Sequence, residues 1–340
     1  MGRSEWGVPS TRRDRHLVAI ETHSLTRYYG DLCAVDHLDL TVQQGELLAF
    51  LGPNGAGKTT TIRMLTGLIR PTEGSALING YDVLRDPLMV KAQVGVVPQR
   101  SNLYAELSAR ENLIFCGQLY GLPRRRWRSR ADELLEEFEL TEQADMRFEA
   151  LSGGMKRRLT IAAALVHAPR ILFLDEPTTG LDVRSARGLR ATIARLRGDG
   201  VTIFLTTHLI QEAERLADRV AIIVRGTLRA VGTPAELCAR CAEEQALRVR
   251  VSGPSDEALL SALNQLPSVL AISRDGEWLR LTVHSVDAAL WEMGATLRQI
   301  GRRIEDIQTV RPSLEDAFVQ ITHLDSEIMQ INVPQRGRGQ

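Results

Sequence analysis

The sequence lacks several features that mark particular classes of protein. Only three of its 42 basic residues are lysines, at positions 58, 91 and 156, and the net charge is zero, so nothing in the overall charge favours nucleic-acid binding. No apolar run approaches the roughly 18 residues that a membrane span needs. Four cysteines are too few for a disulfide framework in 340 residues. We therefore expect a globular protein of the cytoplasm.

The two ends of the chain also lack the patterns of folded elements. Residues 1–16 are rich in arginine and contain no apolar segment, which argues against a secretory signal. We predict a disordered arm over 1–16 and a disordered tail over 325–340. Cys238 and Cys241 have C-x-x-C spacing, but no second pair exists, so an incidental helix-surface pair is favoured over a metal or redox site.

The sequence does contain a glycine-rich loop between an apolar strand, 47–51, and a helix predicted over 60–68. The glycines allow successive backbone N–H groups to point at phosphate oxygens, and the start of the helix adds its positive end. Lys58 is placed to reach the β- and γ-phosphates, and the Thr59 hydroxyl to ligate Mg²⁺. The nucleotide-binding residues predicted here are Gly52, Pro53, Asn54, Gly55, Ala56, Gly57, Lys58, Thr59 and Thr60. Such a strand, loop and helix is typical of a P-loop.

Strands and helices alternate as far as about residue 235. Further strands are predicted over 17–29, 33–42, 74–78, 94–97, 171–174, 201–205, 220–224 and 227–231, and helices over 108–140 with a break at 121–123, over 156–166 and over 186–196. This alternation predicts an α/β fold with a parallel-rich sheet. Functional side chains of such sheets lie at the carboxyl ends of strands. Gln99, Asp175, Glu176 and His208 all occupy such positions.

Two of these positions suggest catalysis on a bound nucleotide. Asp175 can hold Mg²⁺ together with Thr59, and the neighbouring Glu176 can polarise an attacking water. An acid pair without a catalytic role is the alternative, which the P-loop upstream disfavours. Two glycines and a serine, residues 152–154, precede a helix and form a second candidate anion site, with a simple helix cap as the alternative.

The composition changes after Pro234. Residues 247–323 read as strand, helix, strand, strand, helix, strand and helix, which matches a small α+β, ferredoxin-like unit. We therefore predict a main domain over 17–240, with a helical subdomain at about 100–166, and a C-terminal accessory domain over 241–324.

Six motifs follow one another within about residues 17–240: Gly52–Thr59, Gln99, Leu151–Met155, Ile171–Glu176, Gly180–Asp182 and His208. In this order they resemble the ATP-binding cassette of the ATP-binding subunit of an ABC transporter. The resemblance implies a P-loop NTPase cassette fold that binds ATP and Mg²⁺ and hydrolyses ATP. It also implies two cassettes facing head to tail, as a homodimer or a heterodimer. Each ATP would lie between one P-loop and the other subunit's Ser152, Gly153 and Gly154.

The same resemblance implies roles for four further side chains. Tyr29 would stack on adenine, with Tyr28 as the alternative. Gln99 would bind Mg²⁺ and sense the membrane partner, His208 would contact the γ-phosphate, and Asp182 would bridge the subunits. Val183 stands where the family usually has proline, which bears on the rigidity of the loop and not on catalysis.

Residues 311–318, Arg-Pro-Ser-Leu-Glu-Asp-Ala-Phe, resemble the tail motif of exporter cassettes of the daunorubicin-resistance type. This implies a separate ABC-2-type permease as partner, at the cytoplasmic face of the membrane, and export of a drug, antibiotic or lipid-like molecule. No nucleic-acid partner is expected. The arginine-rich run 124–130 is interpreted as a solvated helix start, with contact to anionic lipid or to a permease loop as the alternative.

Two other functions are disfavoured by the sequence. A soluble ABC-type ATPase acting on DNA or ribosomes would need a long coiled-coil insertion or a second cassette, and the chain has neither. A regulatory module, in which the C-terminal domain senses a ligand and ATP acts as a switch, is disfavoured by the intact Glu176.

Overall fold

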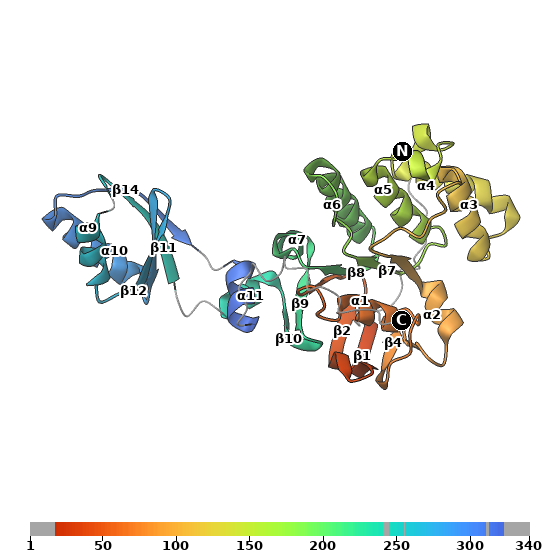
Figure 1. Ribbon diagram of the computed structural model, residues 1–340, viewed down its shortest axis with the longest axis horizontal. Coiled ribbons are helices and arrows are strands. Elements are labelled where there is room, and N and C mark those ends of the chain that lie inside the picture. The colour runs from red at the N-terminus through yellow and green to blue at the C-terminus, as the bar shows by residue number, and fades with distance from the viewer. Residues whose placement is uncertain (1–17, 241–244, 255, 311–312, 323–340) are drawn as a thin grey trace, which may run out of the picture. The chain divides into compact units, whose positions relative to one another are not determined.

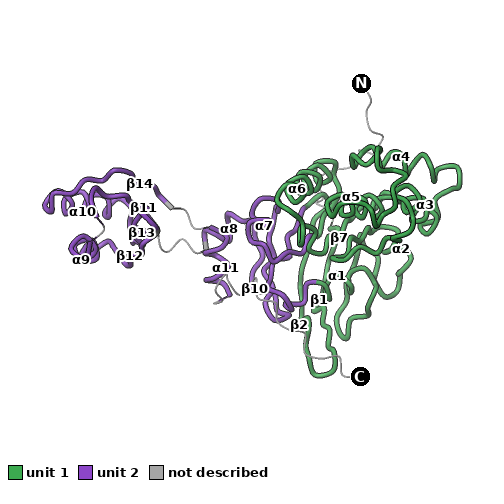
Figure 2. The backbone as a smooth tube through the Cα atoms, turned by 45° about the horizontal axis from the view of Figure 1, so that its top comes forward, with its two compact units in different colours: residues 1–46, 59–204 green, residues 47–58, 205–340 purple. Residues whose placement is uncertain are grey.

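The computed structural model describes residues 18–240, 245–254, 256–310 and 313–322 (Figure 1). The chain divides into two compact units, one of residues 1–46 and 59–204 and the other of residues 47–58 and 205–340 (Figure 2). The predicted arm over 1–16, the predicted tail over 325–340 and Cys241 lie outside the described residues.

The first unit contains an antiparallel sheet near the start of the chain. Its strands are β1 (Val18–Tyr29), β2 (Leu32–Gln43), β4 (Glu73–Ile78) and β5 (Tyr81–Asp82), in the order β2-β1-β4-β5. Leu25 of β1 lies opposite Leu38 of β2, and both side chains are fully buried. Alternating apolar residues thus give this sheet one buried face, as expected for a half-buried antiparallel sheet.

A parallel strand pair in the same unit ends at the predicted catalytic residues. β6 (Val94–Val97) runs parallel to β7 (Ile171–Asp175), with Val94 opposite Ile171. All five residues of β7 are buried, and the four that precede Asp175 are apolar, as expected of a buried parallel strand. β8 (Thr202–Thr207) follows at the point where the chain passes into the second unit.

Helices complete the first unit. They are α1 (Lys58–Leu65), α2 (Pro87–Gln93), α3 (Ala109–Leu119), α4 (Trp127–Glu137), α5 (Gly153–Ala164) and α6 (Val183–Gly198). The helix predicted over 60–68 ends early, because Gly67 is left-handed (φ 67°), and Leu68 is 62% exposed. The helix predicted over 186–196 begins earlier, because Asp182 caps it. α2 was not predicted.

The second unit begins with the strand that precedes the glycine-rich loop. β3 (Leu47–Leu51) runs parallel to β9 (Arg219–Val224), and β9 pairs antiparallel with β10 (Thr227–Gly232). A tight turn joins these two strands, with φ of 50° at Arg225 and 81° at Gly226. The helices that pack here are α7 (Ile210–Leu216), α8 (Pro234–Arg240) and α11 (Leu314–Thr322), of which α7 and α8 were not predicted.

The last helix, α11, packs with these strands. Its residues Leu314, Ala317 and Phe318 lie on one helical face, are fully buried and share an apolar cluster with Leu51 and Val220. The predicted accessory domain, 241–324, included this helix. In the structure its apolar face instead completes the core beneath β3 and β9.

Residues 245–310 form a four-stranded sheet with two helices packed on it, within the second unit. The elements are β11 (Gln245–Val251), α9 (Glu257–Asn264), β12 (Val269–Asp275), β13 (Trp278–Val283), α10 (Val286–Gln299) and β14 (Ile304–Val310), in the predicted order (Figure 1). The sheet order is β12-β13-β11-β14, with antiparallel neighbours throughout. Apolar residues of α9 and α10 pack on one face of this sheet and give it a core of its own. The ferredoxin-like assignment stays a prediction.

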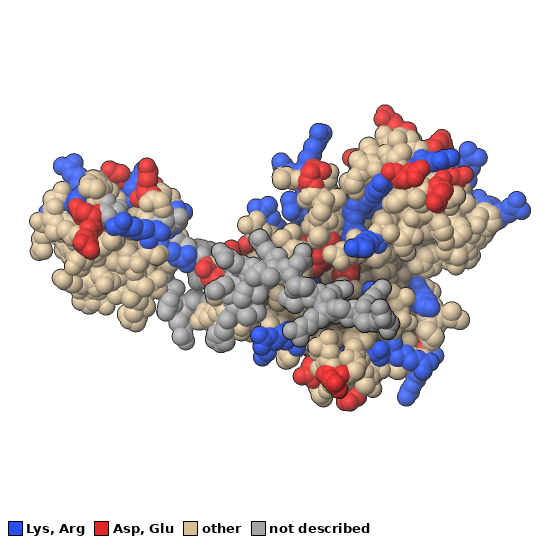
Figure 3. Space-filling view, in the orientation of Figure 1, with Lys and Arg blue, Asp and Glu red and all other residues tan. Residues whose placement is uncertain are grey.

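The charged surface is mixed in sign, with Lys and Arg side chains interspersed among Asp and Glu on the face shown in Figure 3. In the arginine-rich run, Arg124, Arg125 and Arg126 are exposed, whereas Arg130 donates to the backbone oxygen of Leu165 at 3.1 Å. Among the residues described, no helix is long and apolar enough to cross a membrane.

Candidate active site

The glycine-rich loop follows β3 in the second unit, and three of its positions have backbone geometry that favours glycine. Gly52 N–H donates to the Thr207 carbonyl at 3.2 Å, and a Cβ at Gly52 would collide with the Ile223 carbonyl. Gly55 and Gly57 have φ of 79° and 105°, in the left-handed region that favours glycine. These three positions need glycine because of close backbone contact or positive φ.

The Lys58 ammonium lies inside this loop. Lys58 is 5% exposed, and its Nζ donates to the carbonyls of Gly52 at 2.7 Å and Pro53 at 3.1 Å. A buried ammonium framed by a glycine-rich turn is suited to an anion, and a lysine in this position is the phosphate-binding group of P-loops. His208 comes directly after Thr207, whose carbonyl accepts the hydrogen bond from the Gly52 N–H at the start of the loop.

Two pairs of predicted site residues meet in the first unit. Thr59 Oγ1 donates to Asp175 Oδ2 at 2.9 Å, and Gln99 Nε2 donates to Glu176 Oε2 at 3.2 Å. Asp175 and Glu176 are 5% and 8% exposed. The hydroxyl and the carboxylate of the first pair are oxygen ligands of the kind Mg²⁺ prefers, so the residues present fit that ion.

The backbone of Glu176 is strained. Its φ is 45°, which places an ordinary side chain in the left-handed region, at a cost on the order of 1–3 kcal/mol. Thr179 supports this conformation, because its N–H donates to the Glu176 carbonyl and its Oγ1 to Oε2, both at 3.3 Å. Strain of this kind clusters at functional sites, where surrounding contacts hold it in place.

The serine and glycines predicted to form a second anion site begin α5. Ser152 caps the helix by accepting the Met155 N–H at 3.3 Å, and both Ser152 and Gly153 are exposed. A Cβ at Gly154 would come within 2.6 Å of Ser185 Oγ. The segment therefore presents a capped helix start to solvent.

Asp182 lies at the start of α6. Its carboxylate accepts the Ser185 Oγ–H at 2.6 Å and the Ser185 N–H at 2.9 Å, and the hydroxyl bond is the main cause that lowers the pKa of Asp182. Val183, which stands in place of the usual proline, is 84% exposed. The cap is therefore made by Asp182 itself, independently of the residue that follows it.

Both tyrosines proposed for adenine are accessible. Tyr28 is 39% exposed and Tyr29 is 42% exposed, and the Arg27 guanidinium lies 4.8 Å from the centre of the Tyr29 ring. A hydrogen bond with Cys33 raises the pKa of Tyr28. Each ring keeps exposed surface for stacking, so both candidates stand.

Sequence reasoning missed Arg157, the one arginine of α5 that is buried. It is 7% exposed, and its guanidinium donates to backbone carbonyls on either side of Glu176. Arginine is so common in this chain that the presence of an arginine at position 157 does not by itself indicate a function. A usable signal was its position four residues before Ile161, which places it on the apolar face of the helix.

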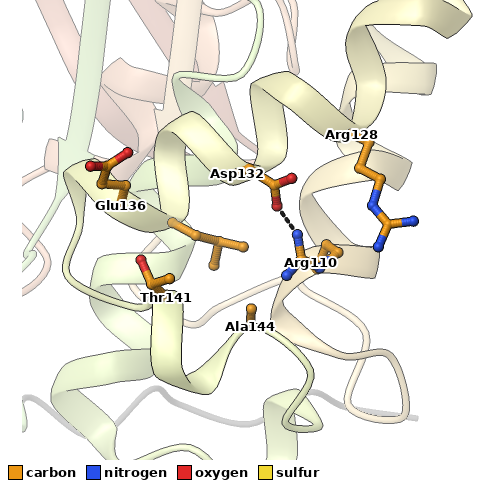
Figure 4. A pocket seen from close by; sticks show the side chains of 7 residues that line it. Arg110, Arg128, Asp132, Glu136, Thr141 and Ala144 are labelled. Carbon is orange, nitrogen blue, oxygen red and sulfur yellow. Dashed lines mark ion pairs between the residues drawn. The ribbon is translucent and has the colours of Figure 1, made fainter.

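A hollow of about 560 Å³ lies in the helical part of the first unit (Figure 4). Its lining consists of Arg110, Arg128, Asp132, Leu135, Glu136, Thr141 and Ala144. Arg110 forms an ion pair with Asp132 and another with Asp145 at 3.2 Å. None of these lining residues belongs to the predicted nucleotide site.

Comparison with known proteins identifies the family. Residues 35–179 match the family model described as ABC transporter. The chain is 39% identical to the daunorubicin resistance ATP-binding protein DrrA3 of Streptomyces coeruleorubidus, over 92% of this chain and 98% of the relative. It is 36% identical to the linearmycin resistance ATP-binding protein LnrL of Bacillus subtilis, over 89% and 98%. It is 41% identical to the Nod factor export ATP-binding protein I of Paraburkholderia xenovorans, over 89% and 97%.

Solved structures agree. An ATP-binding subunit of an ABC transporter matches with a TM-score of 0.60 and 31% identity, over 66% of this chain and 93% of that one. A dimeric ATP-binding cassette in a post-hydrolysis state, bound to ADP and Pi, matches with a TM-score of 0.58 and 27% identity, over 63% and 98%. The predicted P-loop cassette fold is confirmed. The chain belongs to the ABC transporter family and is an ATP-binding subunit that couples ATP hydrolysis to transport.

Proposed function

We propose that this subunit pairs head to tail with a second cassette around two Mg-ATP and drives a separate ABC-2-type permease. The cargo is a drug, antibiotic or lipid-like molecule moved outward, and the subunit sits at the cytoplasmic face of the membrane. The names of the relatives support export, since they refer to resistance to daunorubicin and linearmycin and to Nod factor export. Either a homodimer or a heterodimer is compatible with this proposal.

The observation that carries the proposal is the meeting of Thr59 with Asp175 and of Gln99 with Glu176 at the ends of buried elements. In the proposed site, Lys58 and the loop N–H groups bind the phosphates, and Thr59, Asp175 and Gln99 hold Mg²⁺. The metal would neutralise phosphate charge. Glu176 orients and polarises the attacking water.

The remaining residues are assigned to the composite site. Ser152, Gly153 and Gly154 bind the ATP of the opposite subunit, which is supported by the exposure of the capped start of α5. Asp182 bridges the subunits and His208 contacts the γ-phosphate. Tyr29, or Tyr28 in its place, stacks on adenine.

Glu176→Gln tests this function. The amide keeps the shape of the side chain but removes its charge and its ability to accept a proton. We expect Mg-ATP binding to survive, while hydrolysis falls by roughly 10²–10⁴. ATP then persists and the closed dimer accumulates, which size-exclusion chromatography with Mg-ATP detects.

Asp175→Asn is the matched control, since it also turns one carboxylate into an amide. It weakens the proposed Mg²⁺ site, so we expect weaker Mg-ATP binding and no accumulation of the closed dimer. A Glu176→Gln protein that hydrolyses ATP at the wild-type rate would remove the catalytic role. Co-purification with a polytopic membrane protein separates the transport function from a soluble ABC-type ATPase or an ATP-dependent switch.

A further inference from the structure

The buried guanidinium of Arg157 connects the two strand ends that carry Gln99 and Glu176. Nη1 donates to the Pro98 carbonyl at 2.5 Å, at the end of β6. Nη2 donates to the Asp175 carbonyl at 3.0 Å, at the end of β7. Nε donates to the Pro177 carbonyl at 2.8 Å. All three nitrogens are therefore engaged with backbone oxygens of the first unit.

Two of these carbonyls belong to the residues immediately before and after Glu176. Glu176 is held at a φ of 45°, a conformation that an ordinary side chain avoids unless its neighbours impose it. Hydrogen bonds from one rigid, planar group to the carbonyls on both sides restrict rotation of the peptide units that flank Glu176. Arg157 thus supports the strained backbone at the point where the strain occurs.

The remaining contacts of Arg157 involve Gln99 and the residue before it. Nη1 bonds the carbonyl of Pro98 and lies 3.4 Å from that of Gln99, and the Gln99 side chain in turn bonds Glu176 Oε2 at 3.2 Å. The guanidinium therefore sets the spacing of the two backbone segments whose side chains meet. Moving either segment would lengthen that bond and shift the carboxylate.

We infer that Arg157 is a positioning residue for hydrolysis, which holds Glu176 and Gln99 at the geometry needed to orient the attacking water. This rests on the catalytic role proposed for Glu176. Because Arg157 belongs to α5, whose N-cap is Ser152, it also links the helix of the exposed glycine segment to the hydrolytic residues of the same chain. A change at the start of α5 is thereby transmitted to the water-orienting pair.

The test compares Arg157→Lys with Arg158→Lys in the full-length chain. Lysine keeps the charge but cannot place planar donors on several carbonyls at once. Arg158 is the matched control, since it is on the same helix and donates to the Phe138 carbonyl at 3.0 Å, away from the site. Arg157→Lys is expected to lower kcat about 10²-fold and to change the Kd for Mg-ATP less than about threefold. Arg158→Lys should leave both values near wild type.

A double-mutant cycle separates positioning from a general structural role. If Arg157 acts through Glu176, adding Arg157→Lys to Glu176→Gln should cost little further activity. An equal fold-loss in both backgrounds would overturn the inference, as would a wild-type kcat in Arg157→Lys. If instead Glu176→Gln alone keeps the wild-type rate, the proposed catalytic role fails, which is a distinguishable result.

A second substitution at Arg157 tests whether a fall in activity could come from misfolding of the lysine variant. Arg157→Met fills much of the same volume and leaves no buried charge without partners. Thermal melting establishes whether each variant is folded, and kcat and Kd are measured for the folded variants. The same fall in kcat with retained Mg-ATP binding is expected of Arg157→Met. Loss of folding in both Arg157 variants would assign the residue to stability alone and overturn the inference.

Discussion

At the scale of single residues, local geometry explains why particular amino acids are needed at the site. Gly52 has no room for a Cβ, and Glu176 is tolerated at positive φ because hydrogen bonds hold it there. Lys58 is one of three lysines in a chain that otherwise uses arginine, and its ammonium fits between the carbonyls of Gly52 and Pro53. Each of these positions combines a steric demand with a chemical one.

Lys58→Arg tests whether charge alone suffices in the loop. A planar guanidinium is larger than an ammonium and does not fit a cradle closed by its own carbonyls. We expect Mg-ATP binding to weaken by about 1.5–3 kcal/mol, the value of a charged hydrogen bond, and hydrolysis to be lost. Fluorescent-nucleotide titration and phosphate release measure the two effects.

Lys58→Ala is the companion variant and should behave in the same way. The same exchange at another lysine, Lys91→Arg, offers the control, because Lys91 lies on the exposed side of α2. Wild-type turnover in Lys58→Arg would show that charge alone is enough and would contradict the role assigned to the ammonium.

At the scale of elements, periodicity and capping account for most of the helices and strands. α3 begins at a capping box, in which Ser108 Oγ accepts the Glu111 N–H at 3.1 Å and Glu111 Oε2 accepts the Ser108 N–H at 2.8 Å. The short apolar strands β3 and β7 are buried along their whole length. What α11 packs against is not encoded in its own pattern, because an apolar face at helical spacing specifies burial and not the partner.

Phe318→Ala tests the packing of α11. Phe318 is fully buried in the cluster that includes Leu51 at the end of the strand before the P-loop. Truncation to alanine should destabilise this part of the chain by about 3–5 kcal/mol. Because β3 leads into the loop, nucleotide binding should weaken at temperatures where the wild type still binds. Urea denaturation and nucleotide titration measure the two effects.

Gln320→Ala, on the exposed side of the same helix, is the control and should stay within about 0.5 kcal/mol of wild type. Equal stabilities for Phe318→Ala and Gln320→Ala would show that α11 does not contribute to this core. Such a result would return the helix to the accessory domain over 241–324.

At the scale of the whole molecule, the proposed head-to-tail dimer is the largest step beyond a single chain. Ser152 and Lys58 are assigned to different ATP sites of the dimer, although both belong to one chain. Ser152→Arg and Lys58→Ala should therefore each be inactive as homodimers. A mixed dimer contains one site with both defects and one with neither, so partial recovery of ATPase activity is expected on mixing.

Phosphate release on mixing purified variants measures this recovery, and crosslinking or mass analysis establishes that mixed dimers form. The control is a mixture of Lys58→Ala with Glu176→Gln. In the proposed dimer, Lys58 and Glu176 of one chain act on the same ATP, so each site of the mixed dimer carries one defect and no recovery is expected. Full absence of recovery in the first mixture, with mixed dimers present, would contradict the head-to-tail arrangement.

The sequence alone determined the P-loop, the strand ends that carry Gln99, Asp175 and Glu176, and the family, because these depend on short-range patterns that survive in any context. Only the tertiary structure decided the burial of Arg157, the strain at Glu176 and the packing of α11. Arg157 meets carbonyls 18 to 59 residues away, and α11 packs on a strand more than 260 residues earlier in the chain. Contacts of that separation depend on how the strands and helices are brought together, which no local pattern records.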